Sequence, residues 1–177
     1  MLTAPSFEAT SVEAVGGGTD VDVTGTVTDD QNPAGLTVIL EGIVSGTATV
    51  DANGNFSFRG SASGPGFVTL SVTDNDSETG EGQVEFFDNA PMFTSFSVTQ
   101  LNGNAWRVEG VVSDEFQAGL TVTFGGVLPS GLSTTVKSDG SFSLDFTWAS
   151  PPMGMATGDV DDWWSQSAVT AEEFVWV

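Results

Sequence analysis

The chain has 177 residues, a length that suits one or two domains with a modest core each. It carries 24 acidic residues against three basic ones, a formal net charge of −21. Such a surface repels phosphate backbones and anionic headgroups, so we expect neither nucleic-acid nor membrane-surface binding. Because the sequence has no cysteine and no histidine, it excludes disulfides, thiolate or imidazole metal sites and histidine-dependent catalysis.

The chain begins MLTAPSFEAT, which lacks the basic, apolar and small-residue regions of a signal peptide. No apolar run approaches the roughly 20 residues that span a bilayer. We therefore expect no direct membrane insertion of these residues.

An internal repeat organises the sequence. The segment Val23–Gly42 aligns with Val108–Gly126, and Thr47–Phe58 aligns with Ser133–Leu144, at an offset of roughly 85 residues. We predict two copies of one domain, residues 1–88 and 89–177, joined at the segment DNAP that begins at Asp88.

Within each copy the apolar residues alternate with polar ones, as half-buried strands require. Val21, Val23 and Val27 are examples, and the segments DANGNFSF and SDGSFSL add hairpin turns. Seven short strands per copy predict an all-β chain of two tandem Greek-key sandwiches of the immunoglobulin-like class, with a small barrel as the alternative. The strands expected are residues 6–15, 20–28, 36–41, 46–51, 55–59, 67–73 and 82–87, then 92–101, 105–112, 120–124, 133–137, 141–148, 156–160 and 170–177.

The pattern GTVTD, AGLTV, GTATVDANGNFSF and VTLSVTD resembles the bacterial Ig-like and cadherin-like repeats of large extracellular or surface proteins. DNAPMF, from Asp88 to Phe93, is similar to the cadherin linker, in which an Asp-Asn-Ala-Pro segment ligates calcium between two domains. The resemblance implies calcium at this joint. Phe86 and Phe87 stand where the cadherin pattern has further ligands, so fewer ions are expected.

Acidic residues fall in the loops that an immunoglobulin-type strand order gathers at one pole of each copy. Calcium takes about 6–8 oxygen ligands in irregular geometry, which two such loops and a linker supply. Solvated turns are the other interpretation, because Asp and Asn also stabilise turns. The expected joint ligands are Asp88, Asn89, Asp114, Glu115 and one or both of Asp161 and Asp162, with Asp29, Asp30, Asp74 and Asp76 forming a weaker half-site in the first copy.

Tryptophans suggest a second kind of site. Trp106 is in phase with buried valines and is expected in the core, and Trp148 and Trp176 end strands, where they would pack in the core or at a pole. Trp163 and Trp164 are adjacent on a loop. Packing is the favoured interpretation for this pair, and contact with a glycan or a protein ligand is the alternative.

No catalytic arrangement emerges, because the paired carboxylates gather at loop tips and the glycine runs follow no strand-to-helix pattern. We expect no enzyme. The sequence favours a structural extender or adhesion module of a bacterial extracellular or cell-surface protein, with neighbouring repeats as partners and calcium at the joint. The alternatives are a carbohydrate-binding accessory module of a secreted polysaccharide-active enzyme, or a subunit of a surface fibre or surface layer.

Overall fold

The computed structural model describes residues 3–176. Residues 1 and 2, which begin the first predicted domain, lie outside the described part. So does residue 177, which ends the second predicted domain and the last predicted strand. Chain contacts separate two compact units, the first ending at Asp88 and the second beginning at Asn89. Between residues 3 and 176, no helix is long and apolar enough to cross a membrane.

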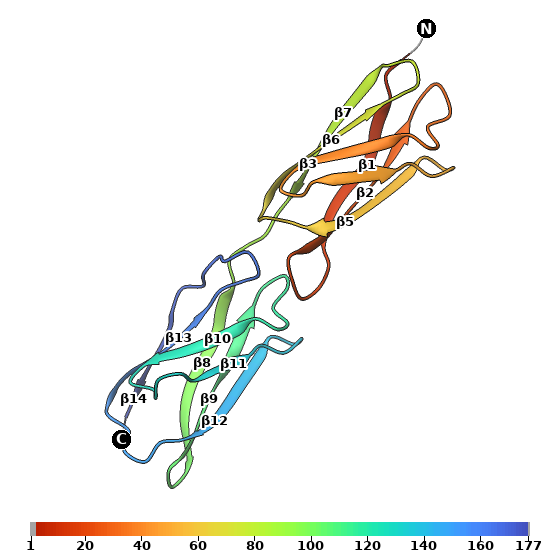
Figure 1. The fold of residues 1–177 in the computed structure, drawn as a ribbon. Helices are drawn as coiled ribbons and strands as arrows, with labels where there is room; N and C mark the ends of the chain where they lie inside the picture. The colour runs from red at the N-terminus through yellow and green to blue at the C-terminus, as the bar shows by residue number, and fades with distance from the viewer. Residues whose placement is uncertain (1–2, 177) are drawn as a thin grey trace. The chain divides into compact units, whose positions relative to one another are not determined.

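The first unit is a sandwich of two antiparallel sheets (Figure 1). A three-stranded sheet has the order β1-β2-β5, and a four-stranded sheet has the order β4-β3-β6-β7. The strands are β1 (Ser6–Ala14), β2 (Asp20–Thr28), β3 (Thr37–Gly42), β4 (Gly46–Thr49), β5 (Asn55–Ser61), β6 (Gly66–Thr73) and β7 (Thr79–Phe86).

The second unit repeats this architecture. Its three-stranded sheet has the order β12-β9-β8, and its four-stranded sheet has the order β11-β10-β13-β14. The predicted fold, two immunoglobulin-like sandwiches of seven strands, is confirmed. The strands are β8 (Met92–Asn102), β9 (Ala105–Ser113), β10 (Thr121–Gly126), β11 (Ser133–Thr135), β12 (Ser141–Thr147), β13 (Gly154–Val160) and β14 (Ala171–Val175).

The cores lie between the two sheets of each unit. Val21 and Val23 on β2 are fully buried, as the alternation predicted, and Trp106 on β9 is only 4% exposed. Burying each of these side chains stabilises the fold by about 1.5–3 kcal/mol. Trp148 is also buried, but Trp176 is 74% exposed, so the prediction that Trp176 packs in a core or pole is wrong: it lies just beyond β14, with its ring beside that of the exposed Phe174.

The two cores fill one equivalent space from opposite sheets. In the first unit Leu70 on β6 is completely buried. In the second, the equivalent β13 residue is Gly158, and the ring of Phe96 on β8 covers it: a Cβ on Gly158 would lie 2.7 Å from Phe96 Cε2. The equivalence follows from the strand register, in which Leu40 is paired with Leu70 and Phe124 with Gly158.

An ion pair crosses the three-stranded sheet of each unit, with its polarity reversed. Arg59 on β5 donates from Nε to Asp22 Oδ1 on β2 at 2.6 Å, and Arg107 on β9 donates to Asp145 Oδ1 on β12 at 2.6 Å. Each pair joins residues directly opposite in the ladder. Hydrogen bonding to the arginine lowers the pKa of Asp22, and likewise that of Asp145. Both arginines of the chain are therefore engaged within their own units.

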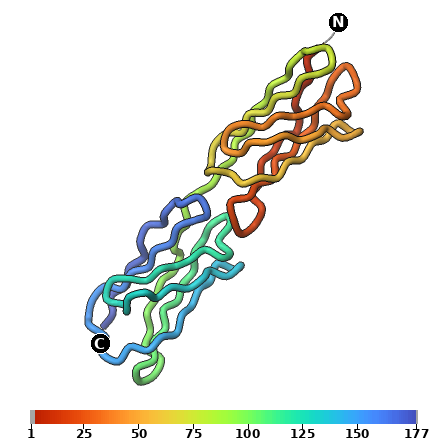
Figure 2. Tube along the Cα trace, in the orientation of Figure 1, coloured from red at the N-terminus to blue at the C-terminus, as the bar shows by residue number. Residues whose placement is uncertain are grey.

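Strand register brings the acidic loops of each unit to one pole, the end at which its first strand enters (Figure 2). Not every acidic residue there is available to a ligand. Asp51 Oδ1 accepts the backbone N–H groups of Asn53 and Asn55, and Asp139 Oδ1 accepts the hydroxyl and the backbone N–H of Ser141. These bonds within the turns lower the pKa of both aspartates. Asp51 and Asp139 therefore each stabilise their own hairpin turn.

Candidate functional site

One aspartate closes the loop after the sixth strand of each unit. In the second unit Asp162 Oδ1 accepts the backbone N–H groups of Trp164 and Gln166, both at 2.8 Å. In the first unit Asp74 Oδ1 accepts the equivalent pair at 2.9 Å. Asp74 and Asp162 are each 8% exposed, and the buried Oδ2 of each has no hydrogen-bond partner among residues 3–176. An unsatisfied buried oxygen costs about 1–3 kcal/mol, more when charged.

Asp114, in the loop after β9, lies within electrostatic reach of Asp162. Its Oδ1 accepts the Phe116 N–H at 2.6 Å, whereas its buried Oδ2 lacks a hydrogen-bond partner in the described chain. Burial raises the pKa of Asp114, and the negative charges of Glu115 and Asp162 raise it further. The loops after β9 and β13 therefore place at one pole two carboxylates that interact electrostatically, and the inner oxygen of each has no hydrogen-bond partner among residues 3–176.

The linker residue Asp88 adds a third acidic group. Oxygens of Asp88, Asp114 and Glu115 all lie within 4.8 Å of one another. The Asn89 side-chain amide donates to Glu115 Oε1, which holds the Glu115 carboxylate beside the entering chain. A shallow pocket of about 400 Å³ adjoins this group, and its lining residues all belong to the second unit: Asn89, Ala90, Met92, Ser113, Asp114 and Glu115.

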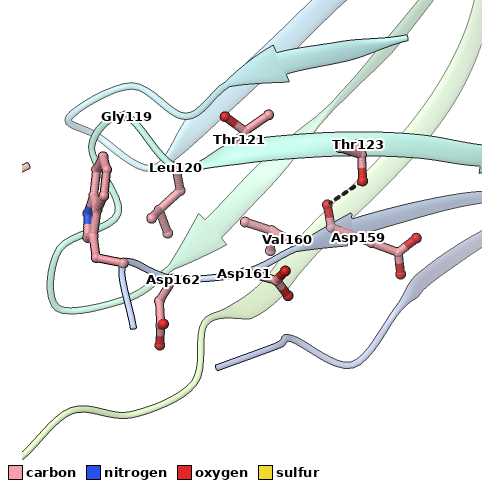
Figure 3. A pocket seen from close by; sticks show the side chains of 9 residues that line it. Gly119, Leu120, Thr121, Thr123, Asp159, Val160, Asp161 and Asp162 are labelled. Carbon is pink, nitrogen blue, oxygen red and sulfur yellow. Dashed lines mark hydrogen bonds between the residues drawn. The ribbon is translucent and has the colours of Figure 1, made fainter. Parts of the chain in front are cut away.

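Asp161 lies apart from this group. Strand alternation buries Asp162 and exposes Asp161, and in Figure 3 the two side chains leave the chain in different directions. Asp161 pairs with Ser167 in an isolated bridge and lines a pocket of about 330 Å³ with Asp159 and Thr123. Of the two aspartates expected at the joint, Asp162 is the one that neighbours Asp114.

The first unit reproduces the same pair of loops. Asp29 takes the position of Asp114, and burial, together with the charges of Asp30 and Asp74, raises its pKa. Asp76 accepts a hydrogen bond from the Gln31 side chain, which ties the two loops together. The predicted half-site residues therefore gather at one pole, with the buried Asp74 at its base.

Trp163 and Trp164 pack within their own unit. The Trp163 indole N–H donates to the Phe116 carbonyl at 3.0 Å, and its ring packs against the core. Trp164 makes an edge-to-face contact with Phe116, with ring centroids 6.2 Å apart. By alignment, Phe116 and Trp164 replace Gln31 and Asp76, so an aromatic contact in one unit takes the place of a hydrogen bond in the other. Aligning the two copies of the internal repeat could have predicted this contact from the sequence.

Sequence reasoning missed a groove in the second unit, beside β8. It is lined by Ala90–Phe96 and by residues from Ser167 to Glu172. The signal was an extra residue just before the last strand of the second copy, which becomes visible only when strand register is known.

No protein-family model matches the chain, and no curated protein matches it. Solved structures that it resembles include the BSP domain of a biofilm-associated protein, at 19% identity over 96% of this chain with a TM-score of 0.36. A Ca²⁺-stabilised adhesin with which an Antarctic bacterium binds ice has 21% identity over 98% of this chain and a TM-score of 0.37. This chain spans 29% and 48% of those two chains.

Fibronectin(III)-like modules of Clostridium thermocellum CbhA are also similar, at 12% identity over 95% of this chain and 93% of theirs, with a TM-score of 0.37.

Proposed function

We propose that this chain is a structural extender and adhesion module of a bacterial extracellular or cell-surface protein, with neighbouring repeats as partners. Calcium bound at the entry pole of the second unit would fix the linker to that unit. The observation that carries the proposal is that two inner oxygens, Asp114 Oδ2 and Asp162 Oδ2, are buried with no hydrogen-bond donor in the described part of the chain.

A cation satisfies this arrangement better than water alone. Removing charged oxygens from water is costly unless an opposite charge compensates. Both arginines are paired on the sheets, and among residues 3–176 no ion pair joins a basic side chain, Lys137 included, to Asp114 or Asp162. Calcium accepts several carboxylate and amide oxygens in irregular geometry. The candidate donors are Asp88, Asn89, Asp114, Glu115 and Asp162.

Calcium also gives the linker a mechanical role. Without a cation, Asp88, Asp114 and Glu115 repel one another at the separations the structure gives them. With calcium bound, the same carboxylates would coordinate one ion, and the chain entering at Asn89 would be held to the loop after β9. An extender needs such a connection, because a flexible linker does not hold neighbouring domains apart in a fixed direction.

Calorimetric calcium titration of the chain, paired with small-angle scattering with and without chelator, tests the proposal. We expect saturable binding with a dissociation constant of about 0.1–1 mM, the range of extracellular calcium modules, and a longer, less variable particle when calcium is present. Asp114→Asn should abolish calcium binding at the pole of the second unit and leave only weaker binding at the half-site of the first unit. Asp88→Ala should remove the calcium-dependent change in particle shape.

Asp139→Asn is the matched control, because Asp139 Oδ1 already accepts hydrogen bonds from Ser141 within its own turn. It should leave both calcium binding and the scattering profile unchanged. Absence of heat at millimolar calcium, or an equal effect of Asp139→Asn and Asp114→Asn, would refute the calcium site. Binding without any change in shape would refute the extender role while leaving the site.

A further inference from the structure

The first and last strands of the second unit border an open groove. β8 is an edge of the three-stranded sheet and β14 an edge of the four-stranded sheet, and within residues 3–176 no ladder joins them. The groove between them has a volume of about 530 Å³ and runs along Ala90–Phe96 on one side and residues 167–172 on the other. One side of the groove is formed by the start of β8 and the residues before it, and the other by the loop that precedes β14 together with Ala171 and Glu172.

One additional residue accounts for the opening. Glu78 and Gln166 are equivalent, because each supplies the carbonyl that closes its loop onto Asp74 or Asp162. Gly82 and Ala171 are equivalent, because they pair with Leu70 and Gly158. Gly82 is the fourth residue after Glu78, whereas Ala171 is the fifth after Gln166. The extra residue interrupts the ladder, so β14 begins only at Ala171, and it leaves Val169 89% exposed.

The first unit closes the same seam. A Cβ on Gly80 would lie 1.9 Å from the Pro5 carbonyl oxygen, and one on Gly82 would lie 2.9 Å from the Phe7 ring. Glycines on β7 therefore let the entering chain lie directly against that strand. In the second unit Ala168 and Ala171 occupy these positions.

The groove offers apolar contacts and negative charge. Met92 is 59% exposed on one side and Val169 faces solvent on the other, while Phe93 and Phe96 are partly buried beneath. Glu172 lines the groove. Thr170, on the same side, donates to Asp159 Oδ1 at 2.6 Å, which adds a second carboxylate nearby. None of the three basic residues of the chain lines the groove.

We propose that this groove binds an extended basic peptide segment, with lysine or arginine alternating with branched apolar residues, laid along the edge of β8. An extended segment gains main-chain hydrogen bonds from a strand edge and specificity from alternate side chains. Branched apolar residues would contact Met92 and Val169, and the basic ones would face Glu172 and Asp159. This binding does not depend on calcium at the entry pole.

The test uses fluorescence anisotropy of the full chain with labelled peptides long enough to span Ala90–Phe96. A peptide of alternating lysine and valine should bind. Replacing lysine by glutamate should abolish binding, and so should placing proline at the central valine, because proline removes a backbone donor. Binding should persist in chelator. No binding of the lysine peptide, or equal binding of the glutamate and proline peptides, overturns the proposal.

Variants of the chain localise the site. Val169→Lys should weaken binding at least about tenfold, since it removes an apolar contact that the bound peptide would bury and adds a charge that repels the basic peptide. Phe67→Lys, at an exposed apolar residue of the first unit, is the control and should change nothing. Deleting Val169 restores the spacing of the first unit and should also abolish binding. If sedimentation instead shows concentration-dependent dimers that Val169→Lys dissociates, the occupant is a second copy and the peptide proposal is wrong.

Discussion

The two units share one strand order but seal the seam between their first and last strands differently. In the first, β7 carries Gly80 where the chain passes closest, and the backbone at Pro5 fits against it. In the second, an added residue near Val169 delays the start of the last strand to Ala171 and leaves a groove. A repeat can therefore keep its fold while converting a closed edge into a potential binding surface, and the change requires a single residue in one strand.

The cores teach the same lesson. Leu70 in one unit and Phe96 in the other fill equivalent space from opposite sheets, with Gly158 making room for the ring. The same space is filled although the individual residues differ, which is the kind of compensated exchange that cores tolerate.

The largest expected effect comes from replacing Gly80, the glycine of β7 against which the chain at Pro5 packs. Gly80→Ala places a Cβ 1.9 Å from a backbone oxygen, so β1 must move, and we expect the first unit to lose about 3 kcal/mol of unfolding free energy. Urea unfolding followed by circular dichroism measures it. Tryptophan fluorescence reports on the second unit alone, since all five tryptophans lie there.

Ala168→Gly is the matched change in the second unit and should cost only about 0.5–1 kcal/mol, through backbone entropy. If the two substitutions have equal effects, the seams do not differ in packing as described.

A smaller effect is expected from exchanging the core residues. Gly158→Leu introduces the residue of the first unit beneath the Phe96 ring and should destabilise the second unit by about 2 kcal/mol through overpacking. Adding Phe96→Thr, the side chain at the equivalent Thr10, should restore much of that loss. Urea unfolding of the two single variants and the double variant gives the coupling between them. Additive losses would contradict the shared space.

The smallest effect concerns the acidic poles, and it depends on pH. Because burial raises the pKa of Asp114, this group stabilises the folded state below its unfolded pKa of about 3.9, and that contribution is lost as the pH rises through the folded value. Without calcium, Asp114→Asn should therefore make the second unit more stable than wild type at neutral pH. The difference should disappear in acid.

Asp139→Asn should change the stability of the same unit in the opposite direction. Its pKa is lowered by Ser141, so its contribution is present above the unfolded pKa and lost as the pH falls through the folded value. The substitution should destabilise the unit at neutral pH. Tryptophan-monitored urea unfolding across the acid range checks both variants, and matching signs would contradict this account of the pole.

Much of the fold was predictable because its signals are local. Alternation on β2, the hairpin turns at Asn53-Gly54 and Asp139-Gly140 and the internal repeat each constrain nearby backbone. The acidic poles followed from strand order. Which of Asp161 and Asp162 faces inward was not predictable, because it depends on where the strand alternation continues past Val160.

Trp176 shows the other limit. A tryptophan next to a strand is usually buried, but the side chains at Phe174 and Trp176 point to the outer face of the sheet. Sequence alternation places residues on one face or the other and does not say which face meets the core: here Ala171 and Val175 face inward, and the aromatic residues share the other face.

The reversed ion pairs bear on how two similar repeats fold next to each other. Adjacent domains of related sequence are prone to exchange strands during folding. If β5 and β12 changed places, Asp22 would stand opposite Asp145, and Arg107 opposite Arg59. Like charges directly across antiparallel strands are unfavourable, whereas each native pairing joins opposite charges. The reversed order of charge in the two ion pairs therefore disfavours exchange of β5 and β12 between the units.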